Sequence, residues 1–288
     1  MSSVAMRTSS ATGADQAPLH RPNKRWTRFL LPGFTWLMIF YLALPVFVMI
    51  LYSFNNIPVI GSPRQTPKFW GFTLHWWRDL FGVAGLRDAL KTSLMIAPIS
   101  AFVATALGTL IGLALGRYRF RGKAPVNFVI FLAIAVPEIV LGSSLLSMFV
   151  LAQTPPIGFA TILLSHIGFS VAFVAVTVRA RVQGLDRSLE DAAQDLFANP
   201  LTTFFKVTLP LIAPAILAGF LLAFVLSLDD FVITNFVSGS TATFPVWVFG
   251  ATRIGLPPQV NVMGTLLFSA GVLAAVANVV VQRRRARS

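Results

Sequence analysis

Six long apolar segments, separated by polar loops, make up most of the 288-residue chain. They cover about residues 29–53, 93–116, 126–152, 159–178, 211–236 and 262–281. Each is long enough to cross a bilayer, since a transmembrane helix needs roughly 20 mostly apolar residues. The pattern therefore predicts an all-α integral membrane protein, with six transmembrane helices that form one domain over residues 26–282.

The polar residues between and beyond these segments are unevenly charged. Residues 1–25 predict a disordered N-terminal tail, and residues 283–288 predict an Arg-rich C-terminal tail. If the segments alternate across the membrane, 17 of the 23 Lys and Arg residues fall on one side. These are Arg7, Arg21, Lys24, Arg25, Arg28, Arg117, Arg119, Arg121, Lys123, Arg179, Arg181, Arg187, Lys206, Arg283, Arg284, Arg285 and Arg287. Because cytoplasmic loops carry an excess of Lys and Arg, both termini are predicted to be cytoplasmic.

Composition narrows the possible functions. Hydrophobic residues make up 56% of the chain and charged residues 11%, and the mean hydropathy is +0.75, which excludes an ordinary soluble domain. With no cysteine and three separated histidines, neither a thiol nucleophile nor a zinc site is expected. Gly122-Lys123 is followed by Ala124, where a phosphate-binding loop needs Ser or Thr. We therefore expect no enzyme activity, cofactor or metal on this chain. The net charge of +13 is interpreted as cytoplasmic loops rather than a nucleic-acid surface.

Residues 184–210 form the longest polar interruption among the later segments. Ser188 and Asp191 resemble a capping box at the start of a short helix, which Asn199-Pro200 ends before a second short helix. Both pieces are too short to cross a membrane, so the pattern predicts an elbow of two helices at the cytoplasmic surface. The first helix has one apolar face, formed by Leu185, Leu189, Ala192, Ala193 and Leu196.

The elbow resembles the EAA loop of bacterial ATP-binding-cassette (ABC) importer permeases. That pattern is Glu-Ala-Ala, three residues, Gly, nine residues, Ile, one residue and Leu-Pro. Here Asp191-Ala192-Ala193 and Leu209-Pro210 match its two ends, Val207 takes the Ile position, and Phe197 replaces the Gly. The resemblance implies the type I ABC importer permease fold. In that fold the elbow is the coupling helix between transmembrane helices 4 and 5, and it sits in a groove of the cytoplasmic ATPase.

The resemblance also suggests which residues couple to the ATPase. They are Glu190, Asp191, Ala192, Ala193, Asp195 and Phe197. Phe197 is expected either to anchor in a pocket of the ATPase or to fold back onto the chain's own spans. Taken alone, the elbow pattern also fits an ordinary amphipathic helix at the membrane interface.

Three carboxylates lie within or near the apolar segments. Glu138 follows Pro137 about 12 residues into the third segment, roughly 18 Å along a helix and close to the bilayer centre. A charge there costs on the order of 2.5–3.5 kcal/mol, so Glu138 is expected to face a polar route, the alternative being a structural Glu. Asp229-Asp230 lies roughly 27 Å along the fifth segment, near its outer end. Adjacent acids point about 100° apart, so only one is expected to face a route; snorkelling to the interface is the alternative.

Further stretches resemble permeases of the putrescine and spermidine (polyamine) importers. They are residues 72–81, 89–94, 136–146, 221–239, 244–249 and 253–258, and the resemblance extends over about residues 29–282. It implies a second homologous permease subunit, an ABC ATPase dimer that binds ATP, an extracytoplasmic solute-binding protein, and a place in the bacterial inner membrane. A polyamine route needs spaced carboxylates and aromatic faces for cation–π contacts. The candidates for this route are Glu138, Asp229, Asp230, Phe231 and Trp247.

The sequence therefore predicts the permease subunit of an ATP-driven ABC importer for a small cationic solute, a polyamine. Three alternatives stay open: a permease for another small solute, an ion-gradient-coupled transporter with Glu138 as proton carrier, and a non-transporting membrane anchor. The elbow favours the importer over the gradient-coupled transporter, and the intramembrane acids disfavour an anchor.

Three smaller expectations concern packing and the outer surface. Gly108, Gly112 and Gly116 recur every fourth residue, which permits close approach of another helix. His166 is expected to form a hydrogen bond with a neighbouring helix. The loop over about residues 54–92 is rich in Trp and Pro, which favours an aromatic belt with a short interfacial helix; a docking surface for a binding protein is the alternative.

Overall fold

The structure, a computed structural model, describes residues 25–57 and 68–285, and every regular element within them is a helix. The chain divides into two compact units, Met1–Met49 and Ile50–Ser288, which we describe separately. The predicted N-terminal tail, apart from its last residue, lies outside the described residues, and so does the end of the predicted C-terminal tail from residue 286 on.

The helix of the first unit is α1 (Arg25–Tyr52). From Leu31 to Tyr52 it is apolar over 22 residues, which is long enough to cross a membrane, as predicted for the first segment. No residue in its most apolar window is buried. Within its own unit α1 therefore has no packing partner.

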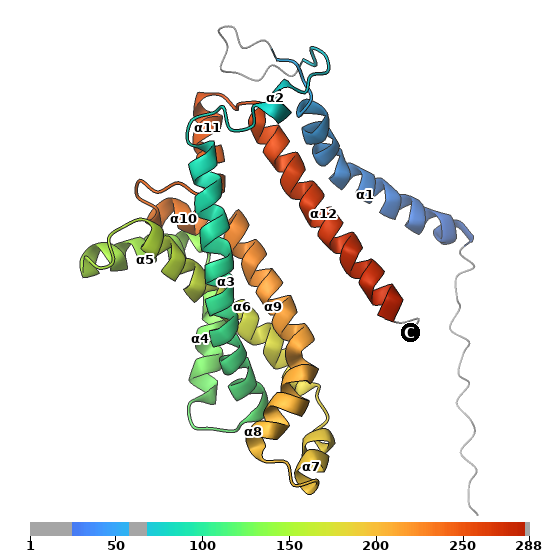
Figure 1. The fold of residues 1–288 in the computed structure, drawn as a ribbon, viewed down its shortest axis with the longest axis vertical. Helices are drawn as coiled ribbons and strands as arrows, with labels where there is room; N and C mark the ends of the chain where they lie inside the picture. The colour runs from blue at the N-terminus through green and yellow to red at the C-terminus, as the bar shows by residue number, and fades with distance from the viewer. Residues whose placement is uncertain (1–24, 58–67, 286–288) are drawn as a thin grey trace, which may run out of the picture. The chain divides into compact units, whose positions relative to one another are not determined.

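Three long helices form the core of the second unit. These are α3 (Leu86–Arg117), α6 (Phe159–Gln183) and α9 (Leu209–Asp229), which pack against one another (Figure 1). Because lipid is as apolar as their side chains, close van der Waals packing rather than the hydrophobic effect holds such helices together. The buried side chains at the centre of this packing are Ala101, Val174, Val178, Ile212 and Ala223.

Three glycines of α3 face α6 and let the two backbones approach closely, which confirms the prediction from their spacing. A Cβ atom on Gly108 would lie 2.6 Å from the Cβ of Val174. One on Gly112 would lie 2.8 Å from the carbonyl oxygen of Ala175, and Gly116 is similarly close to α6. No larger residue fits at these positions without moving one helix away from the other.

The third apolar segment is not the single helix that the sequence predicted over residues 126–152. It consists of α4 (Lys123–Ala135) and α5 (Glu138–Ala152), which are bent by 108° relative to each other. Pro137 has no N–H to donate, and the residue before a proline is driven out of the helical region. Val136 is accordingly extended, with a ψ of 131°.

The fifth apolar segment, predicted over residues 211–236, also breaks. The helix α9 ends at Asp229, Asp230 is extended with a ψ of 119°, and the short helix α10 (Val232–Val237) follows. Because α10 packs against α5 and α6, the segment after the break stays within the bundle.

Three further helices complete the second unit. The four-residue helix α2 (His75–Arg78) is the short helix predicted in the loop after the first segment. The helix α11 (Phe244–Ile254) is tied to α3, because the Phe244 N–H donates to Ser93 Oγ at 2.9 Å. The last helix, α12 (Gln259–Arg285), carries the sixth apolar segment and runs on into the predicted C-terminal tail.

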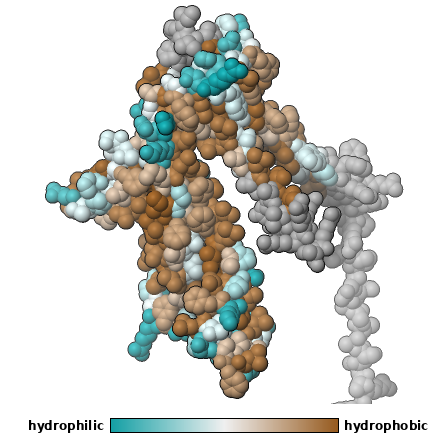
Figure 2. All heavy atoms as spheres, in the orientation of Figure 1, coloured by the Kyte–Doolittle hydropathy of each residue, from teal (hydrophilic) through white to brown (hydrophobic). Residues whose placement is uncertain are grey.

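Four helices of the described chain are long and apolar enough to cross a membrane, and α4 with α5 adds a fifth crossing if the bent pair is one span. The helix α12 adds a shorter apolar stretch over Gln259–Leu273. Figure 2 shows hydrophobic residues over most of the drawn faces of α3 and α9, with hydrophilic residues gathered near the helix ends. The prediction of an all-α protein with several membrane-spanning helices is confirmed.

The elbow between α6 and α9 contains the two predicted short helices and one π-helical turn. The helix α7 (Ser188–Asp195) is followed by α8 (Pro200–Thr203) and by the π turn (Phe204–Thr208). Asn199 caps α8, because its side-chain oxygen accepts a hydrogen bond from the Thr202 N–H at 2.7 Å.

The start of α7 differs from the predicted capping box. Ser188 is already the first helical residue, and its N–H donates to Asp186 Oδ1 at 2.9 Å. Hydrogen bonds from the backbone and then the side chain of Ser188 hold the pKa of Asp186 below its ordinary value. An acid two residues earlier therefore organises this helix start through an Asx turn.

We expect Gly112→Ala to destabilise the protein by about 1–3 kcal/mol, because the added methyl group collides with the backbone of α6. Thermal unfolding of the purified protein in detergent measures the change. Gly168→Ala is the matched control on α6 itself, since a Cβ there meets nothing within 4 Å. Equal melting temperatures for the two variants would contradict the close α3–α6 packing.

Candidate functional site

Glu190 ties the elbow to two long helices. This residue is only 6% exposed, and its carboxylate forms an ion pair with Arg117 at the end of α3. It also accepts a hydrogen bond from Thr208 Oγ1 at 2.7 Å, in the π turn that leads into α9. A single carboxylate thus links α7, α3 and the start of α9.

The other predicted coupling residues of the elbow face outward. Those that are exposed are Asp191, Ala192, Asp195 and Phe197, and Ala193 is half-buried. Of the apolar face predicted for the first elbow helix, Leu189 and Leu196 are exposed, at 48% and 81%, whereas Leu185 packs against the core of the bundle. Glu190 differs, because its charge is neutralised within the chain. We therefore reinterpret it as a residue that holds the elbow in place rather than one that contacts a partner.

Phe197 combines an exposed ring with a left-handed backbone. It is 97% exposed, and its φ is 60°. The Phe197 N–H donates to the Gln194 carbonyl at 2.8 Å, and the Ala198 N–H donates to the Ala193 carbonyl at 3.0 Å. These are the two bonds of a Schellman motif at the end of α7.

The Schellman motif explains the glycine of the EAA pattern. Glycine is usual at this position, because a Cβ atom raises the energy of the left-handed conformation by roughly 1–2 kcal/mol. Phe197 takes that conformation without burying its ring. The exposure contradicts the alternative that Phe197 folds back onto the chain's own spans.

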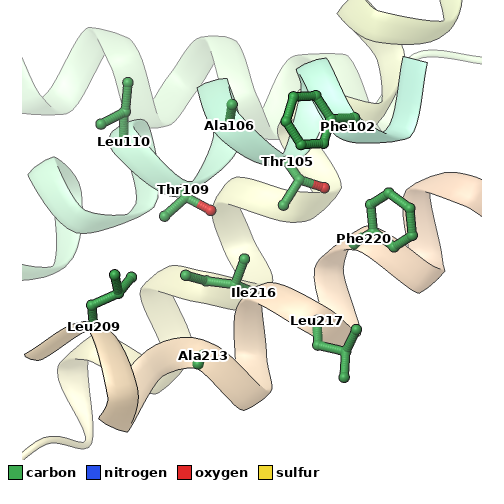
Figure 3. A pocket seen from close by; sticks show the side chains of 10 residues that line it. All are labelled: Phe102, Thr105, Ala106, Thr109, Leu110, Leu209, Ala213, Ile216, Leu217 and Phe220. Carbon is green, nitrogen blue, oxygen red and sulfur yellow. The ribbon is translucent and has the colours of Figure 1, made fainter. Parts of the chain in front are cut away.

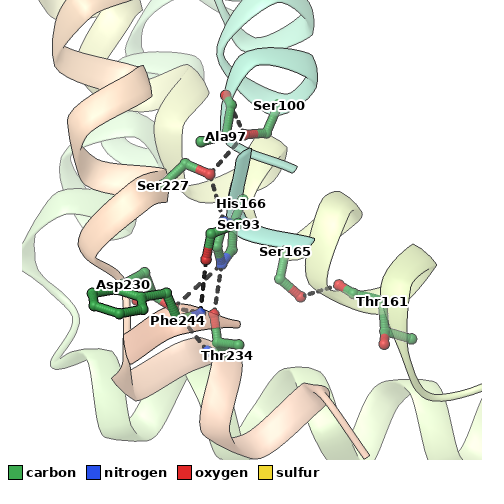
Figure 4. Close-up of polar contacts among 10 residues, drawn as sticks. All are labelled: Ser93, Ala97, Ser100, Thr161, Ser165, His166, Ser227, Asp230, Thr234 and Phe244. Carbon is green, nitrogen blue, oxygen red and sulfur yellow. Dashed lines mark hydrogen bonds and ion pairs between the residues drawn. The ribbon is translucent and has the colours of Figure 1, made fainter. Parts of the chain in front are cut away.

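Asp229 and Asp230 lie in different surroundings. Thr234 donates to Asp230 Oδ2 twice, from its N–H at 2.8 Å and from its Oγ1 at 2.6 Å (Figure 4). The same oxygen lies 3.3 Å from His166 Nε2, and the Asp230 side chain is only 7% exposed. Asp229, the last residue of α9, is exposed. Of the two adjacent acids, only Asp229 is therefore open to a solute.

His166 joins α6 to the break after α9 and to α3. Its Nε2 lies 2.8 Å from Thr234 Oγ1, and its Nδ1 lies 2.7 Å from Ser227 Oγ. Ser227 Oγ in turn lies 2.8 Å from Ser100 Oγ on α3 (Figure 4). This confirms that His166 bonds to a neighbouring helix. Within the described residues, no group of three or more side chains is arranged to hold a metal ion.

Glu138 is the first residue of α5 and is exposed. No described residue forms a hydrogen bond or ion pair with its carboxylate. Because the chain bends by 108° just before Glu138, the depth of roughly 18 Å expected from one continuous helix does not apply. The residue instead lies at the first turn of a helix, where the helix dipole favours a negative charge.

Phe231 and Trp247, the predicted aromatic residues, have different neighbours. The Phe231 ring centroid is 4.5 Å from that of Phe249, and the Arg253 guanidinium lies 4.8 Å from the Phe249 centroid. Trp247 Nε1 donates to the Ala84 carbonyl at 3.2 Å, so its polar edge is used within the chain. Sequence reasoning did not select Phe249 and Arg253, although their i, i+4 spacing on α11 could have shown that they are neighbours.

An open apolar groove of about 710 Å³ runs between α3 and α9 (Figure 3). The hydroxyl groups of Thr105 and Thr109 at this groove have no hydrogen-bond partner among the described residues. Other helical threonines, such as Thr92 and Thr177, donate to the carbonyl four residues earlier. Both hydroxyl oxygens are buried, so they lie beneath the apolar surface of the groove.

Comparison with known proteins places these features in context. Residues 108–286 match a protein family described as binding-protein-dependent transport system inner membrane component. The putrescine transport system permease protein PotI of Escherichia coli K12 is 40% identical over 256 residues, covering 86% of this chain and 87% of PotI. The spermidine/putrescine transport system permease protein PotC of the same strain is 37% identical over 261 residues, covering 90% of this chain and 96% of PotC.

One solved structure supports the fold alone. It is the crystal structure of a bacterial ABC transporter involved in the import of the acidic polysaccharide alginate. The matching chain is 15% identical, with a TM-score of 0.65, covering 92% of this chain and 99% of its own length.

We expect Arg117 and Glu190 to be energetically coupled. Removing one partner strands a largely buried charge, so Arg117→Gln or Glu190→Gln alone is expected to destabilise the protein by on the order of 1–3 kcal/mol. The double variant is expected to lose less than the sum, with a coupling of at least about 1 kcal/mol in thermal or chemical unfolding. Arg119→Gln, a change at an exposed neighbouring arginine, is the control. Strict additivity of the two single effects would show that the ion pair does not hold the elbow.

Proposed function

Because the chain belongs to the family of binding-protein-dependent transport system inner membrane components, and is a permease of an ABC importer, we propose that it carries a polyamine across the bacterial cytoplasmic membrane. The names of its relatives at 40% and 37% identity support putrescine or spermidine as the solute. These relatives are transport permeases, in keeping with a chain that does no chemistry of its own.

Asp229 is the residue that supports a cationic solute most directly. It ends a stripe of exposed residues on α9, in which Leu217, Leu221 and Val225 precede it at four-residue intervals. Residues four apart lie on the same side of a helix. A polyamine has ammonium groups that a carboxylate attracts and methylene groups that tolerate an apolar wall. This stripe combines both features.

Two further features suit a cationic solute. Glu138 is exposed at the bend between α4 and α5, with no cation of the described chain paired to it. Phe231 packs against the Phe249 ring, over which Arg253 lies, so aromatic rings suited to cation–π contacts gather near this end of the bundle. Several weak contacts would let a solute enter and leave more readily than one tight site.

The elbow is the proposed contact with the ATPase. Its support is the outward-facing set of Asp191, Ala192, Asp195 and Phe197, together with the half-buried Ala193. ATP is bound and hydrolysed by the partner ATPase dimer, whose motion reaches the spans by alternating access. The excess of basic residues on the elbow side supports a cytoplasmic elbow and cytoplasmic termini.

The remaining proposed partners are a second homologous permease subunit and an extracytoplasmic solute-binding protein. The open apolar groove between α3 and α9 supports the second subunit, because a helix of another subunit can pack into such a groove. The α1 span, unburied in its own unit, offers another surface for such a subunit.

We expect Asp229→Asn and Glu138→Gln each to reduce ATP-driven uptake of labelled putrescine by about tenfold, which corresponds to about 1.4 kcal/mol. Both changes remove a charge and keep the shape, so the affinity of the binding protein for putrescine is expected to stay the same. Uptake is measured in proteoliposomes with the complete transporter. Asp88→Asn, at an exposed acid of α3 away from the stripe, is the control. Wild-type uptake by both variants would remove the physical support for a cationic solute.

We expect Phe197→Gly to weaken association with the ATPase by more than about 1 kcal/mol, because a large exposed side chain is lost from the contact. The isolated chain is expected to melt at the same or a higher temperature, since glycine removes the cost of the left-handed backbone. Phe197→Tyr keeps the ring and the backbone cost, and serves as the control. Full association of the glycine variant would show that Phe197 is not an anchor.

A further inference from the structure

We propose that His166 and Asp230 form a buried imidazolium–carboxylate pair, a site inside the helix bundle that binds one proton and keeps Asp230 away from the solute. The site joins α6 to the break between α9 and α10. Its proton binding stands on geometry alone, while its effect on the solute rests on the proposed polyamine transport.

Asp230 is ionised in this arrangement. Two donors of Thr234 converge on its Oδ2, the N–H at 2.8 Å and the hydroxyl at 2.6 Å, and His166 Nε2 lies 3.3 Å from the same oxygen. A carboxylate only accepts hydrogen bonds, whereas a protonated acid must also donate one. An ionised carboxylate with 7% of its side chain exposed needs a cation nearby. Within the described chain, His166 is the group that forms an ion pair with it.

The hydrogen bonds also place a proton on His166 Nε2. Thr234 has one hydroxyl proton, and it goes to Asp230. Its oxygen can therefore only accept at the 2.8 Å contact with His166 Nε2, so Nε2 must be protonated.

A chain of hydroxyl groups accommodates the second ring proton. Nδ1 lies 2.7 Å from Ser227 Oγ, which lies 2.8 Å from Ser100 Oγ, which lies 3.1 Å from the Ala97 carbonyl. If Nδ1 donates, Ser227 can donate to Ser100 and Ser100 to Ala97, so every proton has an acceptor. If Nδ1 loses its proton, both serine hydroxyl groups can rotate. Ser227 then donates to Nδ1 and Ser100 donates to Ser227, so Ser100 no longer donates to the Ala97 carbonyl. The charged ring therefore allows one more hydrogen bond than the neutral ring does.

Few other charges lie near the imidazole. The helices packed against α6 are α3, α4, α9 and α10, and α5 contacts α10; the charged residue of α4, Lys123, is its first residue and donates to the Tyr118 carbonyl. Asp229 is adjacent to Asp230, Glu138 begins α5, and Lys91 lies nine residues before Ser100 on α3. None of these three forms a hydrogen bond or ion pair with the ring among the described residues. Because His166 neutralises Asp230, Asp229 is left as the acid that meets the solute.

Nitrogen NMR of the assembled transporter in nanodiscs tests the site directly. The chain has three histidines, so the signal of His166 can be assigned by its loss in His166→Gln. We expect both ring nitrogens of His166 to carry a proton at neutral pH, because the buried Asp230 carboxylate needs a cation beside it. In Asp230→Asn, which removes that carboxylate, the Nδ1 proton is expected to be absent. An unprotonated Nδ1 in the wild type at neutral pH would overturn the proposal. The same protonation state of His166 in the wild type and in Asp230→Asn would also overturn it.

Thermal unfolding of the same complex provides a second test. His166→Gln and Asp230→Asn are each expected to lower the melting temperature, and the double variant is expected to regain part of the loss because no unpaired charge stays buried. A double variant no more stable than the less stable single variant would also count against the pair. If the NMR result holds while Asp229→Asn transports putrescine normally, the proton site stands and the proposed solute route fails.

Discussion

A charge buried among apolar helices has to be neutralised within the chain. Two buried ion pairs do this here, and each connects helices that are distant in sequence. Glu190 is paired with Arg117, and Asp230 with His166. Removing one partner of such a pair leaves an uncompensated charge, so these contacts resist opening. In both cases the adjacent acid, Asp191 or Asp229, is exposed. In each pair of adjacent acids, one carboxylate forms an ion pair within the chain and the other is exposed.

The basic partners of the two ion pairs lie on helices that pack against each other. Arg117 belongs to α3 and His166 to α6, and the glycines of α3 bring these helices into close contact. A force on the elbow would reach α3 through Glu190 and α9 through Thr208. The break after α9 is held to α6 by His166. In the proposed importer, a movement imposed by the ATPase therefore has a connected mechanical route to the residues around Asp229.

The sequence predicted the features that depend on local pattern. The apolar segments, the elbow, the short helix in the loop and the close approach through Gly112 follow from composition and spacing. It did not predict features that depend on packing. The bend at Pro137 was missed because proline can also be accommodated in a membrane helix. Helical spacing separates Glu190 from Asp191 by about 100°, but does not say which of them faces inward. That choice depends on Arg117, which is distant in sequence.

The division of each pair of adjacent acids into one buried and one exposed acid can be tested by cysteine labelling. The chain contains no cysteine, so single-cysteine variants at Asp229, Asp230, Glu190 and Asp191 give unambiguous signals. The rate of reaction with a water-soluble maleimide is measured in membranes stripped of the ATPase. We predict fast labelling of Asp229→Cys and Asp191→Cys, and slow labelling of Asp230→Cys and Glu190→Cys. Equal rates within either pair of adjacent acids would contradict the account.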